Sequence, residues 1–151
     1  MKLRLSVKYG VARAGLPADS SLRRWAYAAL KGLRRRRVAL GLRIVDDVES
    51  AALNGRFRRK LYSTNVLSFP FEPPPGTRSD MIGDLVICAP VVRREARTQH
   101  KPVNAHWAHM VVHGILHLRG YDHRKRQDAV VMEKKEIRLL KELGYANPYI
   151  Q

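Results

Sequence analysis

The chain has 151 residues, of which 45% are hydrophobic, enough for one ordinary globular core. Its 29 lysines and arginines against 13 acidic residues give a formal net charge of +16. A field of that strength attracts polyanions. Nucleic acid is therefore the favoured partner, an anionic membrane surface is the second choice, and a soluble basic protein without such a partner is the plain alternative.

The only cysteine, Cys88, cannot form a disulfide within the chain, so we expect no disulfide partner. It lies in the apolar run 85–88, which is typical of a buried strand. The N-terminal residues alternate apolar and polar side chains, unlike a secretory signal. No stretch has the length and apolar character of a transmembrane helix. These features favour a cytoplasmic protein with no membrane partner.

Strand and helix patterns alternate in the first half of the chain. The expected elements are a strand at 3–7, a helix at about 22–38, a strand at 42–45, a short helix at about 48–57 and a strand at 64–70. Asp19 or Ser20 is available as the N-cap of the first helix. The arginine run 34–37 is expected mainly on the outer side of that helix.

The second half begins with a proline-rich loop. The expected elements are a central strand at 83–88, a helix to about 98, a helix from Pro102 to about 119, and a helix at about 127–143 that Gly144 stops. No repeat or linker divides the chain. We therefore expect a single α+β domain over residues 1–151, with a four-stranded mixed sheet and about five helices.

Three histidines have the spacing of a metal site. His113 and His117 are four residues apart, so they share one face of a helix. Gly120 allows the chain to leave the helix, after which His123 can turn back toward the other two. Three neutral imidazoles can bind zinc and leave a fourth position for water. We therefore expect one Zn²⁺ per chain, held on a central buried helix and the turn after it.

His106 and His109 lie on the same stripe of this helix. Hydrogen-bonded core histidines are the alternative, and the better interpretation for any single one of these residues. His109 with His113 is a competing pair at i, i+4. The glycine turn and His123 favour the metal site, which leaves His106 and His109 as supporting or substrate-facing residues. Asp122 either orients a ligand or caps the next segment.

The same histidine spacing occurs in metzincin proteases, where a glutamate follows the first histidine and acts as the general base. In this chain that position is Gly114, which cannot transfer a proton. A metalloprotease is therefore a disfavoured alternative. Turnover of a generic peptide that stops on chelation would revive it.

Four cations occur within five positions, just before the third expected strand: Arg56, Arg58, Arg59 and Lys60. An arginine beside a metal can hold phosphate oxygens and stabilise the charge that grows during phosphoryl displacement. A solvated basic loop is the other interpretation, and it is preferred for all of them except Arg58. The runs 34–37 and 124–126 favour general phosphate contacts over catalysis.

Together these motifs resemble the YbeY endoribonucleases, also called rRNA maturation factors. The similar segments are 53–58, 64–70, 83–88, 95–99, the histidine motif 113–123 and 132–133, within a span from about Leu42 to Gly144. The resemblance implies a metal-dependent, single-strand-specific endoribonuclease in the 3′-end maturation of 16S rRNA and in ribosome quality control. The implied partners are single-stranded RNA, the small ribosomal subunit and an assembly GTPase.

The resemblance assigns a metal, usually zinc, to the same three histidines and a functional role to Arg58. Departures from the family pattern lie beside that arginine, at Arg59, Leu61 and Ser63. The candidate catalytic residues are Arg58, His109 and His113, while metal-activated water, His109 and the RNA 2′-hydroxyl all stay open as the base. The alternative is a ribosome assembly factor that acts mainly by binding, with structural zinc; a fourth coordination position filled by a protein side chain would favour it.

Overall fold

The computed structural model describes residues 1–58 and 65–150, without the side chains of residues 57 and 58. In chain order the elements are β1 (Lys2–Tyr9), α1 (Asp19–Ala29), β2 (Arg37–Val45), α2 (Asp47–Arg58), β3 (Val66–Pro70), β4 (Met81–Cys88), α3 (Ala89–Thr98), α4 (Val103–Leu118) and α5 (Arg126–Glu142). Within these described residues, the expected α+β fold with four strands and five helices in one domain is confirmed. No helix in the described part of the chain combines the length and apolar character that crossing a membrane requires.

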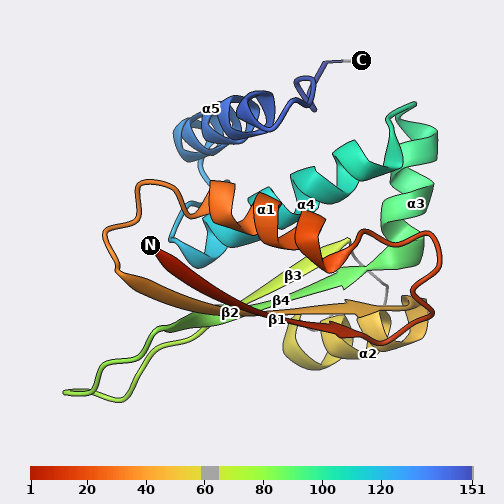
Figure 1. Ribbon diagram of the computed structural model, residues 1–151. Helices are drawn as coiled ribbons and strands as arrows, with labels where there is room; N and C mark the ends of the chain where they lie inside the picture. Colours follow the sequence, from red (N-terminus) through yellow and green to blue (C-terminus); the bar gives the residue numbers. More distant parts are fainter. Residues whose placement is uncertain (59–64, 151) are drawn as a thin grey trace.

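The strands form one sheet in the order β1-β2-β4-β3. β2 pairs in parallel with both β1 and β4, whereas the edge strand β3 is antiparallel to β4. The apolar sequence of β4 predicted an interior strand, and that prediction is confirmed. Helices α1 and α4 cover one face of the sheet, and α2 lies against the other (Figure 1).

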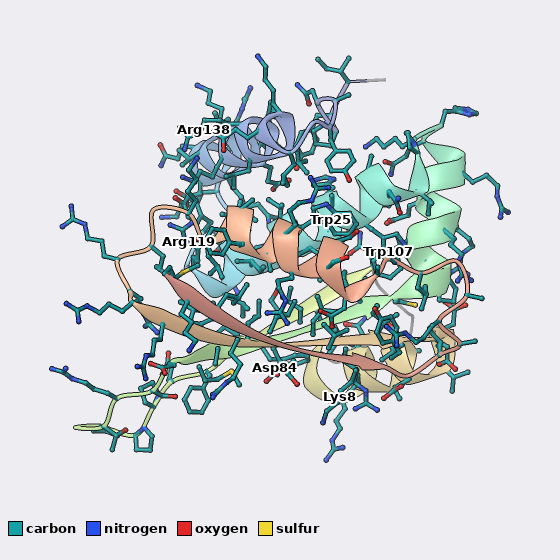
Figure 2. All side chains as sticks on the ribbon, viewed as in Figure 1. Lys8, Trp25, Asp84, Trp107, Arg119 and Arg138 are labelled. Carbon is teal, nitrogen blue, oxygen red and sulfur yellow. The ribbon has the colours of Figure 1, made fainter. Side chains whose placement is uncertain are left out.

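The main core lies between the sheet and helices α1 and α4. Trp25 of α1 and Trp107 of α4 are fully buried members of the core cluster, and both are labelled in Figure 2. Gly114 lets α4 approach closely, because a Cβ atom at this position would lie only 2.7 Å from Leu85 Cδ2. Ser68 of β3 adds a hydrogen bond of 3.1 Å from its hydroxyl to the Gly114 carbonyl. One side of α4 is therefore fixed against the sheet.

The prediction of a helix at about 22–38 is wrong at both ends. Helix α1 begins at Asp19 with Ala18 as its N-cap, and no side chain caps it. It ends at Ala29, and Gly32 then turns the chain with φ 88°. The arginines at 34–36 lie in this turn, and the strand that follows begins earlier than expected, at residue 37.

A residue far away in the sequence holds the end of this helix. Arg119 Nη1, just beyond α4, donates hydrogen bonds to the carbonyls of Ala29 and Lys31, at 2.8 and 3.2 Å. These carbonyls are near the C-terminus of α1, where the helix leaves acceptors without partners. The following apolar run 38–40 fits a buried helix or a buried strand equally well by periodicity, and pairing with two neighbouring strands decides for the strand.

Candidate metal centre

The three predicted ligand histidines lie together at the C-terminal end of α4. Each of His113, His117 and His123 offers a ring nitrogen, and these atoms all lie within 4.8 Å of one another. The ring centroids are 4.7 to 5.7 Å apart. His113 and His117 are half-buried and His123 is exposed, so a ligand from solvent can reach the group.

A glycine turn returns His123 toward the helix, as the sequence indicated. Gly120 has φ 98°, and the amide of Tyr121 donates back to the Leu116 carbonyl at 3.0 Å. Asp122 Oδ1 then accepts the amide of His123 at 2.7 Å. This hydrogen bond lowers the pKa of Asp122. In the structure the carboxylate of Asp122 therefore holds the backbone of His123.

A buried carboxylate that the sequence analysis missed supports the centre from behind. Glu136 of α5 is 1% exposed and contacts both His113 Nδ1, at 3.0 Å, and His109 Nε2. The Tyr149 hydroxyl donates a third hydrogen bond to it, at 2.6 Å. Burial by itself raises the pKa of Glu136, but the hydrogen bonds from the two histidines outweigh it and lower the pKa to about 2. Glu136 is therefore an ionised acceptor at neutral pH.

A signal for Glu136 was present in the sequence. Met132, Glu136 and Leu140 are spaced four residues apart, so they lie on one face of α5. Met132 and Leu140 are buried core residues. A charged residue in the middle of an apolar stripe is rarely buried without a partner. What the sequence did not contain was the identity of that partner, which lies on another helix.

The remaining histidines of the stripe are also tied to carboxylates. Burial lowers the pKa of His109, so the neutral ring donates Nε2–H to Glu136. Its Nδ1 is buried and has no hydrogen-bond partner among the described residues. His106 Nε2 lies 3.0 Å from Glu95 Oε1, and Asn65 Nδ2 donates to the same oxygen at 3.1 Å. His109 shares Glu136 with His113, which is the supporting position considered from sequence, whereas His106 contacts Glu95 and no ligand histidine. No observation tests a catalytic role for His109.

The donor set at the end of α4 fits a metal ion. His117 Nε2 lies 3.1 Å from His123 Nδ1. Two ligands of a tetrahedral zinc ion are about 3.3 Å apart, given Zn–N distances of about 2.0–2.1 Å. Burial and the neighbouring histidines lower the pKa of His117 to about 4, which keeps its lone pair available at neutral pH.

A second group of donors, formed by His109, His113 and Glu136, also lies within 4.8 Å. Its members already contact one another directly, at 2.5 and 3.0 Å, as hydrogen-bonded histidine–carboxylate pairs. A metal ion between them would have to replace these bonds. We therefore assign this group to support of the first one.

The other predicted site residue is Arg58, the last residue of α2. Its side chain lies outside the described residues, as do residues 59–64. The role of Arg58 therefore stays a prediction. Gly114, in contrast, gains a structural reason for its identity, because a side chain there would collide with Leu85 and Val66 of the sheet. A glutamate at this position would not fit the packing.

Comparison with known proteins gives consistent matches. The family model described as "Endoribonuclease YbeY" matches residues 17–144. A relative with that description from Methylococcus capsulatus is 55% identical over 136 residues, covering 90% of this chain and 89% of the relative. The relative from Alkalilimnicola ehrlichii is 55% identical over 151 residues, covering 97% and 91%. The solution structure of TM1509 from Thermotoga maritima shares the fold, with a TM-score of 0.62, 23% identity and 99% coverage of both chains.

Proposed function

The chain belongs to the YbeY endoribonuclease family, and on that premise we propose that it is a metal-dependent endoribonuclease that cleaves single-stranded RNA. The observation that carries the metal dependence is the convergence of His113, His117 and His123 at a solvent-accessible end of α4. The net charge of +16 supports a polyanionic substrate.

One zinc ion would be held by His117, His123 and the Nε2 atom of His113. Such an ion, when bound, polarises a phosphoryl oxygen and makes a water molecule more acidic. Glu136 accepts the Nδ1–H of His113, which fixes the tautomer of that ring and leaves Nε2 with the lone pair. Asp122 holds the turn that carries His123 in place.

The charge on the phosphate would be neutralised by Arg58, which we keep as the proposed catalytic arginine. His109 donates a hydrogen bond from its Nε2–H to Glu136, and its Nδ1 atom is buried. In this conformation His109 therefore supports the centre rather than facing substrate. The RNA 2′-hydroxyl and an activated water are then the better candidates for the nucleophile, and His109 is retained as a candidate for the base.

The cellular role we propose is the 3′-end maturation of 16S rRNA and ribosome quality control in the cytoplasm. The small ribosomal subunit and an assembly GTPase are the proposed partners. The support for this role is family membership, together with a basic surface suited to rRNA. A buried lone cysteine, Cys88, suits a reducing compartment.

The second candidate is an assembly factor that acts mainly by binding, with zinc as a structural element. A structural zinc site is closed by four protein ligands. Within the described residues the histidine group has three members, and His123 is exposed. This arrangement favours a site with an open position, and hence the enzyme.

His117→Ala tests the proposal. We expect the purified wild-type protein to contain about one metal ion per chain and to cleave a fluorescent single-stranded RNA, but not a matched duplex. The variant should lose the metal and at least about 100-fold in cleavage rate, because a catalytic ion contributes several kcal/mol. Metal content by mass spectrometry and cleavage rate are measured on the same samples.

The control is His100→Asn, which changes an exposed histidine outside the group. Asparagine suits the positive φ of 55° at this position. The control should keep both metal and activity. Undiminished cleavage by metal-free His117→Ala would refute the metal-dependent mechanism. A wild-type protein that binds zinc and RNA without cleavage, and unfolds on chelation, would establish the binding factor instead.

A further inference from the structure

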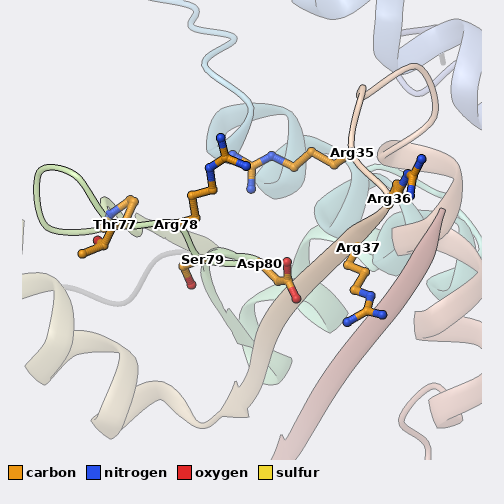
Figure 3. A pocket seen from close by; sticks show the side chains of 8 residues that line it. Arg35, Arg36, Arg37, Thr77, Arg78, Ser79 and Asp80 are labelled. Atoms are coloured by element: carbon orange, nitrogen blue, oxygen red, sulfur yellow. The ribbon is translucent and has the colours of Figure 1, made fainter.

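A hollow of about 740 Å³ lies where β2 and β4 begin, and no histidine is among the residues that line it. Its lining comes from the start of β2 with the turn before it, and from the loop before β4, as the close view in Figure 3 shows: Arg35, Arg36, Arg37, Pro73, Thr77, Arg78, Ser79 and Asp80. We call it the arginine pocket. In Figure 3 the side chains of Arg35 and Arg78 extend from opposite loops toward the same region. The guanidinium groups of Arg35 and Arg78 therefore face the same region, and Arg36 and Arg37 also contribute to the lining.

Backbone hydrogen bonds hold the two loops in place. The Lys2 amide donates to the Arg36 carbonyl at 2.7 Å, and the Ala39 amide donates to the Asp80 carbonyl at 2.8 Å. Ser79 Oγ accepts the amide of Met81, which starts β4, at 3.1 Å. The pairing of β2 with β4 thus brings together loops about 40 residues apart in the sequence. The pocket is part of the fold and not a chance meeting of long side chains.

The arginines of the pocket differ from others in the chain. Arg43 and Arg94 each contact a carboxylate, of Glu49 and Asp47 respectively. Among the described residues, none of the four pocket arginines forms an ion pair or a side-chain hydrogen bond, and all four are exposed. The lining carries a single carboxylate, Asp80. Such a surplus of like charge is relieved when an anion binds.

The pocket and the histidine centre lie at the same end of α4. Leu118, the last residue of this helix, packs so close to Gly83 that a Cβ atom there would be 2.7 Å from it. Arg119 is bonded to Ala29 and Lys31, at the start of the turn that carries the pocket arginines. An RNA strand held at the histidines can therefore continue along this end of the molecule toward the pocket.

We propose that the arginine pocket binds the phosphodiester backbone of single-stranded RNA at phosphates beyond the one that is cleaved. Guanidinium forks match phosphate oxygens and read no base. The pocket would thus raise affinity for long RNAs without contributing to the chemical step. This inference rests on the proposed RNA substrate.

The test compares a pocket variant, Arg35→Gln/Arg78→Gln, with a control of equal charge, Arg97→Gln/Arg138→Gln. Arg97 and Arg138 are exposed residues of α3 and α5, outside the pocket. Binding of labelled single-stranded RNAs of increasing length to the metal-free proteins is measured by fluorescence anisotropy at several salt concentrations. The measurement is thus independent of cleavage.

For long RNAs we expect the pocket variant to bind about tenfold more weakly, since it loses two surface contacts between guanidinium groups and phosphates. The slope of log affinity against log salt should fall by about 1.4, from about 0.7 for each lost phosphate contact. For the shortest RNAs the affinity of the pocket variant should equal that of the wild type. The control variant should show a small loss of affinity at every RNA length.

Asp80→Asn supplies a test of opposite sign, because removing the opposing carboxylate should tighten binding of long RNAs. A folding defect could not produce such a gain. Equal affinities of pocket variant and control at all lengths would overturn the proposal. Displacement of RNA by micromolar inorganic phosphate would also overturn it, because the pocket would then be a site for a small anion. A pocket variant that binds RNA normally but no longer binds anionic vesicles would overturn it as well. Failure of the proposed function appears separately, as a wild type that binds RNA and does not cleave it.

Discussion

The carboxylate of Glu136 accepts hydrogen bonds from His109, His113 and Tyr149 while only 1% of the residue is exposed. A buried ion is tolerated when its partners satisfy it, and its removal leaves those partners without an acceptor. Two of the partners are histidines of the stripe on α4. Glu136 therefore connects the stability of the α4–α5 packing with the orientation of one candidate metal ligand.

Glu136→Gln should weaken both functions of this residue. The amide keeps the shape but loses the charge, and its nitrogen cannot accept a hydrogen bond from a histidine. We expect zinc affinity to fall about 10- to 100-fold, as is typical when the carboxylate behind a ligand histidine is changed. The free energy of unfolding of the metal-free protein should fall by about 3 kcal/mol. Competition with a chelating dye and urea denaturation measure the two effects.

The matched control is Glu133→Gln, which changes an exposed glutamate one turn earlier on α5 by the same chemistry. It should alter neither quantity by more than a few tenths of a kcal/mol. Wild-type zinc affinity in Glu136→Gln would show that His113 does not depend on this carboxylate for its orientation.

At the scale of elements, helix α4 does two jobs on two faces. One face carries the histidines, and the other packs on β3 and β4 through Gly114. Gly114 is buried in the middle of the helix, where alanine would ordinarily be favoured by about 1 kcal/mol. The close approach to Leu85 explains why glycine occupies the position instead.

Gly114→Ala should therefore destabilise the protein despite the better helix propensity of alanine. The new methyl group would lie 2.7 Å from Leu85 Cδ2 and 3.2 Å from Val66 Cγ2, so the helix or the strand must shift. Overpacking of this kind costs about 1–3 kcal/mol. The free energy of unfolding from urea denaturation checks the sign, and a stabilised variant would contradict the close packing.

Leu85→Val separates this clash from other causes. Valine lacks the Cδ atoms that the new methyl group would meet. In a double-mutant cycle, Gly114→Ala should therefore cost less in the Leu85→Val background than in the wild type. Additive effects would mean that the two side chains do not compete for the same space.

Local patterns were sufficient to predict most elements and the three-histidine group, because periodicity and a glycine turn act within one stretch of chain. The end of α1 was mispredicted because Arg119, 90 residues away from Ala29, supplies the bond that helps to end it. Glu136 was missed for the same reason, since its histidine partners are on another helix. Contacts across the fold decide such features, and one sequence does not reveal them.

On the scale of the whole molecule, acid should lower the free energy of unfolding by more than the protein's surplus of positive charge alone suggests. The folded protein keeps His117 neutral and Glu136 ionised, with pKa values of about 4 and about 2 in place of 6.5 and 4.5. Both shifts have the same sign, because in each case the unfolded chain binds a proton that the folded protein refuses. Stability is therefore fully present above about pH 6.5 and falls as the pH falls.

The two groups act in successive windows in the metal-free protein. Protonation of unfolded His117 lowers the free energy of unfolding between about pH 6.5 and 4, and protonation of unfolded Glu136 lowers it between about pH 4.5 and 2. The second window should contribute about 3 kcal/mol, at 1.36 kcal/mol for each pH unit. Urea denaturation of wild type and Glu136→Gln at a series of pH values measures it. Their difference at pH 7 should shrink toward zero as the pH approaches 2, whereas parallel curves through this range would contradict an ionised Glu136 in the folded protein.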